Sequence, residues 1–195
     1  LTLLAMLGLV AALLSKESAF IFPVLLLLFV VLLPLDLAEQ ADRRAAYTRR
    51  AVPLVAALAI MAVYGVLRVT VLKFGDDAAA PAVPFGERLT DALQAFAFYI
   101  KLLILPANLH MERTLEGVPG WATFAGALLL LLCFAVFVLA LRTGQRRIAL
   151  GMAWFIAAWL PISGLFPLNA PMAEHWMYVP MAGFWWALLE GLALL

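Results

Sequence analysis

Charged residues, cysteine and histidine are all scarce in this sequence. Only 13% of the 195 residues are charged, and there are one cysteine and two histidines. A soluble globular domain has about a quarter of its residues charged, so this composition argues against one. The lone Cys133 cannot form a disulfide within the chain, and we expect it to be a packing residue. The net charge of +1 gives no reason to expect a nucleic-acid partner.

Apolar residues are correspondingly frequent and make up 67% of the chain. A membrane span needs about 20 mainly apolar residues, and it must be helical because unpaired backbone groups are costly in hydrocarbon. We therefore predict an all-α fold, a polytopic transmembrane helical bundle with about six spans. The runs that predict these spans are 1–14, 19–35, 53–72, 121–141, 148–165 and 179–195.

A seventh segment, 88–105, has a different pattern. Its polar residues Arg88, Asp91, Gln94 and Lys101 fall on one arc of a helical projection. An amphipathic helix suits the membrane interface better than a full crossing, so we predict one interfacial or re-entrant helix here.

The basic residues predict the orientation of the spans. Seven of the 13 lysines and arginines lie in two short segments, 36–52 and 142–147, which we expect to face the cytoplasm. If 88–105 does not cross, alternation places residues 15–18, 73–120 and 166–178 on the outer side. We therefore predict a multi-pass protein of a bacterial inner membrane, with its active face on the periplasmic side.

Both ends of the chain read as cut. Leu1 begins within an apolar run, without an initiator methionine or a charged leader, and residues 191–195 end within another run. We find no Gly/Ser linker, low-complexity tract or convincing internal repeat. We therefore expect residues 1–195 to be a single membrane domain, a fragment of a longer chain.

The polar residues that are candidates for a site collect on the predicted outer side. Each also has a plainer interpretation, such as a lysine reaching the interface beside its ion-pair partner, an arginine stacked on Tyr64, or an aromatic belt. The two histidines lie far apart in the sequence without close ligand spacing, which argues against a metal site. The candidate substrate-binding residues are Lys16, Glu17, Arg68, His110, Glu112, Glu174, His175 and Tyr178.

Taken together, these residues suggest chemistry on a lipid phosphate. Lys16, Arg68 and His175 supply cationic or donor groups for a phosphate, and arginine suits bidentate contact. A carboxylate can act as base toward an acceptor hydroxyl. A transporter would place polar groups near the bilayer midplane, where this chain has few charges. We predict no cofactor and leave a requirement for a divalent cation open.

Four segments resemble those of a known family, in the same order. Residues 13–19 (LLSKESA), 99–109 (YIKLLILPANL), 154–163 (WFIAAWLPIS) and 173–184 (AEHWMYVPMAGF) are similar to segments of the transmembrane and tetratricopeptide-repeat O-mannosyltransferases and their bacterial relatives. From the first to the last they span residues 13–184, which is nearly the whole chain.

The resemblance implies a C-type glycosyltransferase fold that uses a polyprenyl-phosphate sugar on the lumenal or periplasmic side. It implies that Lys16 and Glu17 match a family pair, and that Glu174 matches the acid of a Glu-Arg pair in which His175 replaces the arginine. The family's catalytic acid precedes this region and its repeats follow it, so both would belong to the missing ends, and the catalytic residue stays unknown.

Three hypotheses follow. The first is part of a membrane glycosyltransferase, in which Lys16 contacts the donor phosphate, Arg68 and His175 assist, Glu17 and Glu174 orient these cations, and Glu112 touches sugar or acceptor. Its partners would be membrane lipid, the polyprenyl-phosphate sugar and an acceptor protein or glycan. The second is a flippase for a lipid-linked sugar, which needs a polar path between leaflets. The third is a non-catalytic membrane anchor for a repeat domain.

Overall fold

The computed structural model describes residues 2–72, 83–166, 168 and 170–194. It is 79% helical, with eight α-helices among the described residues, which confirms the all-α class. The chain forms two compact units, Leu1–Ala82 and Val83–Leu195, and each is described here by itself.

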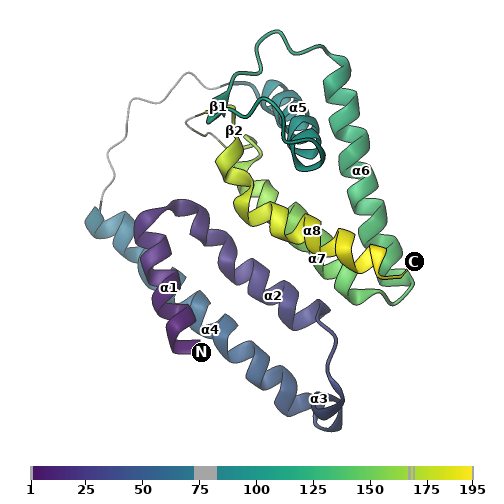
Figure 1. Ribbon diagram of the computed structural model, residues 1–195. Coiled ribbons are helices and arrows are strands. Elements are labelled where there is room, and N and C mark those ends of the chain that lie inside the picture. Colours follow the sequence, from purple (N-terminus) through teal and green to yellow (C-terminus); the bar gives the residue numbers. More distant parts are fainter. Residues whose placement is uncertain (1, 73–82, 167, 169, 195) are drawn as a thin grey trace. The chain divides into compact units, whose positions relative to one another are not determined.

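The first unit is a set of packed helices (Figure 1). Its small core consists of Met6, Leu9 and Leu13 of the first helix against Ala57 and Tyr64 of the fourth. Its elements are α1 (Thr2–Ser15), the 3-10 segment η1 (Glu17–Ile21), α2 (Phe22–Leu32), α3 (Leu37–Ala41), α4 (Arg43–Leu67) and the π-helical segment η2 (Arg68–Leu72).

The second unit contains four longer helices and a short strand pair. Its largest buried side chains include Phe96, Tyr99 and Phe155. Its elements are α5 (Phe85–Ile104), β1 (Glu112–Arg113), α6 (Trp121–Arg142), α7 (Arg146–Trp159), the 3-10 segment η3 (Leu160–Ile162), β2 (Met172–Ala173), the 3-10 segment η4 (Glu174–Met177) and α8 (Tyr178–Leu192).

Two helices in the described part of the chain are long and apolar enough to cross a membrane. They are Arg43–Val71, with 29 residues, and Trp121–Arg142, with 22. The helices in the other four apolar runs are shorter than the roughly 20 residues of a full span. These are α1, α2, α7 and α8, with 14, 11, 14 and 15 residues.

The turn between α6 and α7 reverses the chain in three residues. Gly144 has φ +75°, a left-handed conformation that suits glycine. The Gln145 amide donates to the Ala140 carbonyl at 2.8 Å and the Gly144 amide donates to that of Leu141 at 3.3 Å. These two bonds end α6 in a Schellman motif. The basic turn therefore lies at the end of α6 opposite to the loops that hold the strands (Figure 1).

Glycine lets α7 and α8 approach closely. A Cβ atom on Gly151 would lie 2.6 Å from the Ala187 amide nitrogen and 2.8 Å from the Gly183 carbonyl oxygen. A Cβ atom on Gly183 would lie 2.6 Å from the Gly151 carbonyl oxygen. Small residues that bring backbones together are typical of helix pairs in membranes, where apolar burial does not drive association.

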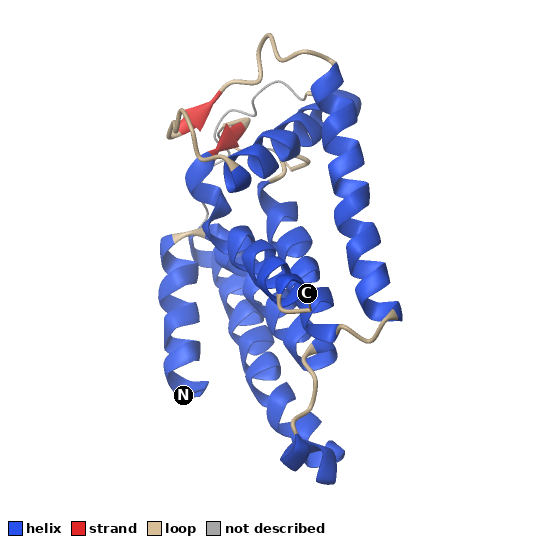
Figure 2. Cartoon of the chain, turned by 45° about the vertical axis from the view of Figure 1, so that its right-hand side comes forward, coloured by secondary structure: helices blue, strands red, loops and turns tan. Residues whose placement is uncertain are grey.

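Helix α5 lies crosswise over the end of the second unit that holds the strands (Figure 2). It packs against α6, where a Cβ atom on Gly126 would overlap the Leu93 carbonyl oxygen at 1.8 Å. Gln94, predicted on the polar arc of this helix, is instead buried and donates to Thr123 Oγ1 of α6 at 3.2 Å. A buried amide needs such a partner, so one part of the predicted polar arc is a helix contact.

Candidate functional site

A two-residue strand pair joins the two loops that carry most of the candidate residues of the second unit. Strands β1 and β2 are antiparallel, with Glu112 opposite Ala173 and Arg113 opposite Met172. The first loop follows α5 and the second follows α7. Two segments about 60 residues apart in the sequence therefore lie side by side. The predicted alternation of spans puts both of them on the outer side of the membrane.

Tyr99 of α5 holds the second loop through two hydrogen bonds to its backbone. Its hydroxyl donates to the Ala173 carbonyl oxygen at 3.1 Å and accepts from the Ala173 amide at 3.2 Å. The side chain is fully buried, and burial raises the pKa of Tyr99 to about 12, so the hydroxyl stays protonated and can donate. Tyr99 is not among the predicted site residues, although it lies in a segment that carries the family resemblance.

The centre of the site is an ion pair between the two loops. Arg113 Nε lies 2.7 Å and Nη2 lies 2.6 Å from Glu174 Oε1, and the His110 backbone amide donates to the same oxygen at 2.9 Å. Arg113 Nη2 also donates to the carbonyl of Asn108, which has φ +54°. Three donors on one carboxylate oxygen hold both loops in one arrangement.

This environment controls the charge of Glu174. Burial by itself raises its pKa, but the hydrogen bond from the His110 amide and the hydrogen bond and charge of Arg113 outweigh it, so the pKa of Glu174 is lower than its ordinary value. The carboxylate is therefore ionised at neutral pH and is poorly suited to take a proton. Glu174 is better suited to orient Arg113 than to act as a general base.

Two pockets flank the ion pair. The first, here called the polar pocket, has a volume of about 300 Å³ and is lined by Phe98, His110, Glu112, Arg113, Thr114 and Leu115. The second, here called the apolar pocket, has a volume of about 290 Å³ and is lined by Tyr99, Leu102, Leu103, Pro106, Leu109, Glu174, His175, Met177, Tyr178 and Met181. Arg113 thus faces one pocket and Glu174 faces the other.

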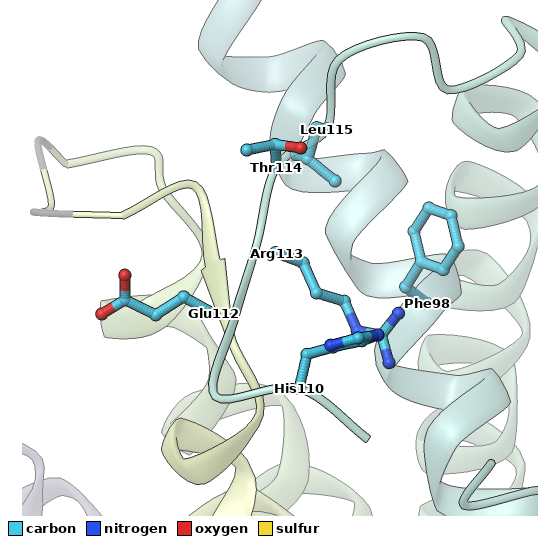
Figure 3. Close-up of a pocket in the computed structure, with 6 residues that line it drawn as sticks. All are labelled: Phe98, His110, Glu112, Arg113, Thr114 and Leu115. Atoms are coloured by element: carbon cyan, nitrogen blue, oxygen red, sulfur yellow. The ribbon is translucent and has the colours of Figure 1, made fainter. Parts of the chain in front are cut away.

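The side chains of the polar pocket alternate along the strand. Figure 3 shows His110 and Arg113 on the side of the strand that faces Phe98, and the Glu112 carboxylate pointing to the opposite side. This is the ordinary alternation of neighbouring residues in a strand. Arg113 Nη1 donates to no described residue, so this atom is free to donate into the pocket. The contact of Glu112 with sugar or acceptor stays a prediction. The guanidinium of Arg113 is the charged group on the side of the strand that faces Phe98.

His175 and Tyr178 lie at the apolar pocket with different exposure. His175 Nδ1 is buried and has no hydrogen-bond partner in the described part of the chain. Tyr178 is 69% exposed at the start of α8. Both residues line the apolar pocket together with Glu174, their near neighbour in the sequence.

The other three candidate residues belong to the first unit. Lys16 is exposed, in an extended conformation between α1 and η1. Glu17 begins η1, and its side chain lies outside the described part of the structure. Arg68 is partly buried and its Nη1 atom donates to the Tyr64 hydroxyl at 3.5 Å. Tyr64 is also its partner in the plainer interpretation, which stacks the arginine on the tyrosine ring. The proposed cluster of Lys16, Arg68 and His175 stays a prediction.

Arg113 is the residue that sequence reasoning missed. It is not among the predicted site residues, and Glu174 is predicted to orient Lys16, Arg68 and His175. The signal was present, because two short segments rich in polar residues both lie on the predicted outer side. A carboxylate in one and an arginine in the other are natural partners once the segments pair.

Glu190, the acid in the last apolar run, has partners at the other end of the second unit. Its Oε1 atom lies 3.5 Å from Arg147 Nη1 and accepts from Trp186 Nε1 at 3.3 Å. Arg147 belongs to the basic segment 142–147, so the carboxylate of Glu190 forms its ion pair next to that turn. Across the described residues, no group of three or more His, Cys, Asp or Glu side chains is placed to hold a metal ion.

The chain matches no protein-family model, no curated protein and no solved structure. The family resemblance of the four segments therefore stays a hypothesis, and the proposals below rest on the geometry of the chain itself.

Proposed function

We propose that this chain is part of an integral membrane glycosyltransferase, which transfers a sugar from a polyprenyl-phosphate donor to an acceptor on the periplasmic side of a bacterial inner membrane. The observation that carries the proposal is the Arg113–Glu174 ion pair between a polar and an apolar pocket. A lipid-linked sugar has a charged phosphate between a polar sugar and an apolar chain, so it needs both kinds of surface and a cation between them.

The proposed membrane arrangement keeps six crossings. Helices α4 and α6 are long enough to cross without help. The shorter α1, α2, α7 and α8 would cross as parts of a bundle, since tilting and local thinning of the bilayer accommodate short helices at modest cost. Helix α5 would lie at the outer interface, because it carries Glu87, Arg88, Asp91 and Lys101 and lies crosswise to α6 (Figure 2).

Each group at the ion pair has a role that its geometry permits. Arg113 would donate to a phosphate oxygen through Nη1, while Glu174 holds the guanidinium from the other side. Tyr99 would keep the second loop in register through Ala173. In the first unit, Lys16 would contact the donor phosphate, as the first hypothesis has it. The group that activates the acceptor is left unassigned.

The test is sugar transfer in native membranes that contain the full-length protein, with polyprenyl-phosphate mannose or glucose carrying a labelled sugar. We expect Arg113→Gln and Lys16→Ala each to reduce transfer at least tenfold, because a hydrogen bond to a charged group contributes about 1.5–3 kcal/mol and about 1.4 kcal/mol is a factor of ten. Arg147→Gln is the matched control, since it also removes the arginine of an ion pair with a glutamate.

Three results would count against the proposal. Transfer that is unaffected by Arg113→Gln removes the ion pair from the mechanism. Movement of the labelled lipid between leaflets without a glycosylated product would support a flippase. Normal transfer in membranes whose protein lacks Lys16, Arg113 and Glu174 together would support a membrane anchor.

A further inference from the structure

The basic segment 36–52, which runs from α3 into the start of α4, has all its carboxylates engaged in local structure. Asp36 caps α3: its Oδ1 accepts from the Glu39 amide at 2.7 Å, and its own amide donates to Glu39 Oε2 at 3.1 Å. Asp42 caps α4 by accepting from the Ala45 amide at 3.0 Å. Carboxylates at helix N-termini are held by backbone donors and by the helix dipole.

One arginine of this segment is also fully engaged. Arg50 donates from Nε to Glu39 Oε1 at 3.0 Å and from Nη2 to Oε2 at 2.5 Å, and its Nη1 donates to the Leu33 carbonyl at 2.7 Å. The hydrogen bonds from Arg50 and Asp36, with the charges of Arg50 and Arg49, lower the pKa of Glu39 despite some desolvation. Arg50 therefore serves the structure of the segment.

The remaining charge is positive and exposed. Arg43 and Arg44, in the first turn of α4, are exposed, and their guanidinium groups form no hydrogen bond or ion pair with any residue that the structure describes. They also begin the helix at the end of its dipole that repels cations, so local electrostatics do not explain their position. An external anion would stabilise both.

The same segment carries two exposed apolar side chains. Leu37 of α3 is 87% exposed, and Tyr47 is 40% exposed one turn after Arg43 on α4. The apolar stretch of α4, the longest candidate membrane helix, begins a few residues later. The headgroup layer of a membrane is anionic on its water side and apolar on its inner side. Its chemistry is matched by arginine and tyrosine at the end of such a helix, with an exposed leucine on the short helix before it.

We infer that Leu37, Arg43, Arg44 and Tyr47 form a binding surface for anionic phospholipid headgroups, here called the α3–α4 lipid surface. Arg43 and Arg44 contact the lipid phosphates, and Leu37 and Tyr47 extend toward the acyl chains. The inference depends on the membrane insertion stated under the proposed function but not on sugar transfer.

The test measures lipid contact at the surface itself. A fluorescent label on the thiol introduced by Thr48→Cys, in a protein that also carries Cys133→Ser, reports on spin-labelled lipids in vesicles of phosphatidylcholine mixed equally with phosphatidylglycerol. We expect quenching by headgroup-labelled phosphatidylglycerol to exceed quenching by the phosphatidylcholine probe. Each arginine near an anionic surface changes the association constant roughly fivefold at low salt, so Arg43→Gln with Arg44→Gln should remove most of the preference.

The charge-retaining variant Arg43→Lys with Arg44→Lys is the matched control and should keep the preference. Leu37→Ser should lower quenching by both lipids alike, because it removes insertion rather than charge. Equal quenching by both lipids in the unsubstituted arginine background overturns the inference. A preference that inorganic phosphate abolishes at constant ionic strength also overturns it, because the surface would then bind free phosphate. Loss of sugar transfer with this preference intact would affect only the proposed function.

Discussion

Arg113 and Glu174 are separated by 61 residues in the sequence, yet Arg113 Nη2 lies 2.6 Å from Glu174 Oε1. Arg113 comes before α6 and Glu174 comes before α8, so one helical hairpin, α6–α7, lies between them in the sequence. Their side chains are 22% and 15% exposed, which leaves the pair partly screened by solvent. It therefore positions two loops more than it stabilises the fold.

The ion pair should give the second unit a measurable dependence on pH. Because the folded-state pKa of Glu174 is lower than its ordinary value, its contribution to stability is complete above about pH 4.3 and is lost as the pH falls toward the folded-state pKa. Thermal unfolding in detergent should show Glu174→Gln less stable at pH 7, by about 1 kcal/mol at most. The difference should shrink in acid, and a constant difference would contradict the assignment.

Loss of the Tyr99 hydroxyl should loosen the second loop. Tyr99→Phe removes both hydrogen bonds to Ala173, and the expected cost is about 1–2 kcal/mol in the free energy of unfolding. Hydrogen exchange of the Ala173 amide should accelerate in this variant. Tyr178→Phe, at an exposed tyrosine, is the control that should change neither quantity. Equal behaviour of the two variants would show that the Tyr99 contact is not needed.

The close packing of α7 and α8 predicts opposite effects for two glycine-to-alanine changes. Gly151→Ala places its Cβ against the backbone of α8 and should destabilise the protein by about 1–3 kcal/mol. Gly191→Ala, within α8 but with open space around its Cβ, should be neutral or stabilise by up to about 1 kcal/mol. Thermal unfolding of both variants in the same detergent checks this. A stable Gly151→Ala protein would mean that the helices pack differently.

The predicted sidedness can be tested with a membrane-impermeant maleimide on single cysteines in a Cys133→Ser background. Ser15→Cys and Glu116→Cys should label from the outside of intact cells, and Thr143→Cys should label only after the membrane is opened. Thr143 is preferred to Gly144, because the left-handed φ of Gly144 would strain a cysteine. Labelling of Glu116→Cys and Thr143→Cys from the same side would show that α6 does not cross.

The helices could be predicted from the sequence because they depend on local patterns. Each of the six apolar runs contains a helix over most of its described length, and the α6–α7 turn falls within the predicted basic segment. Helix α4 begins at Arg43, ten residues before its apolar run, because Asp42 supplies an N-cap that hydropathy does not detect.

The site could be predicted only in part, because its contacts are not local. His175 and Tyr178 are neighbours of Glu174 in the sequence, so their shared pocket was foreseeable. The choice of Arg113 as the partner of Glu174 depends on the pairing of two two-residue strands, which are too short for a sequence pattern. Gln94 was misplaced for a similar reason, since its burial depends on where α6 packs.

The position of the ion pair also sets when the site can exist during synthesis. Arg113 is made before α6 and α7, and Glu174 only after them, so a growing chain carries an unmatched arginine through the synthesis of both helices. The two loops can pair only after the α6–α7 hairpin has been made. The ion pair is thus a late event in synthesis, and a ribosome stalled within α7 would hold a chain whose two loops are still unpaired.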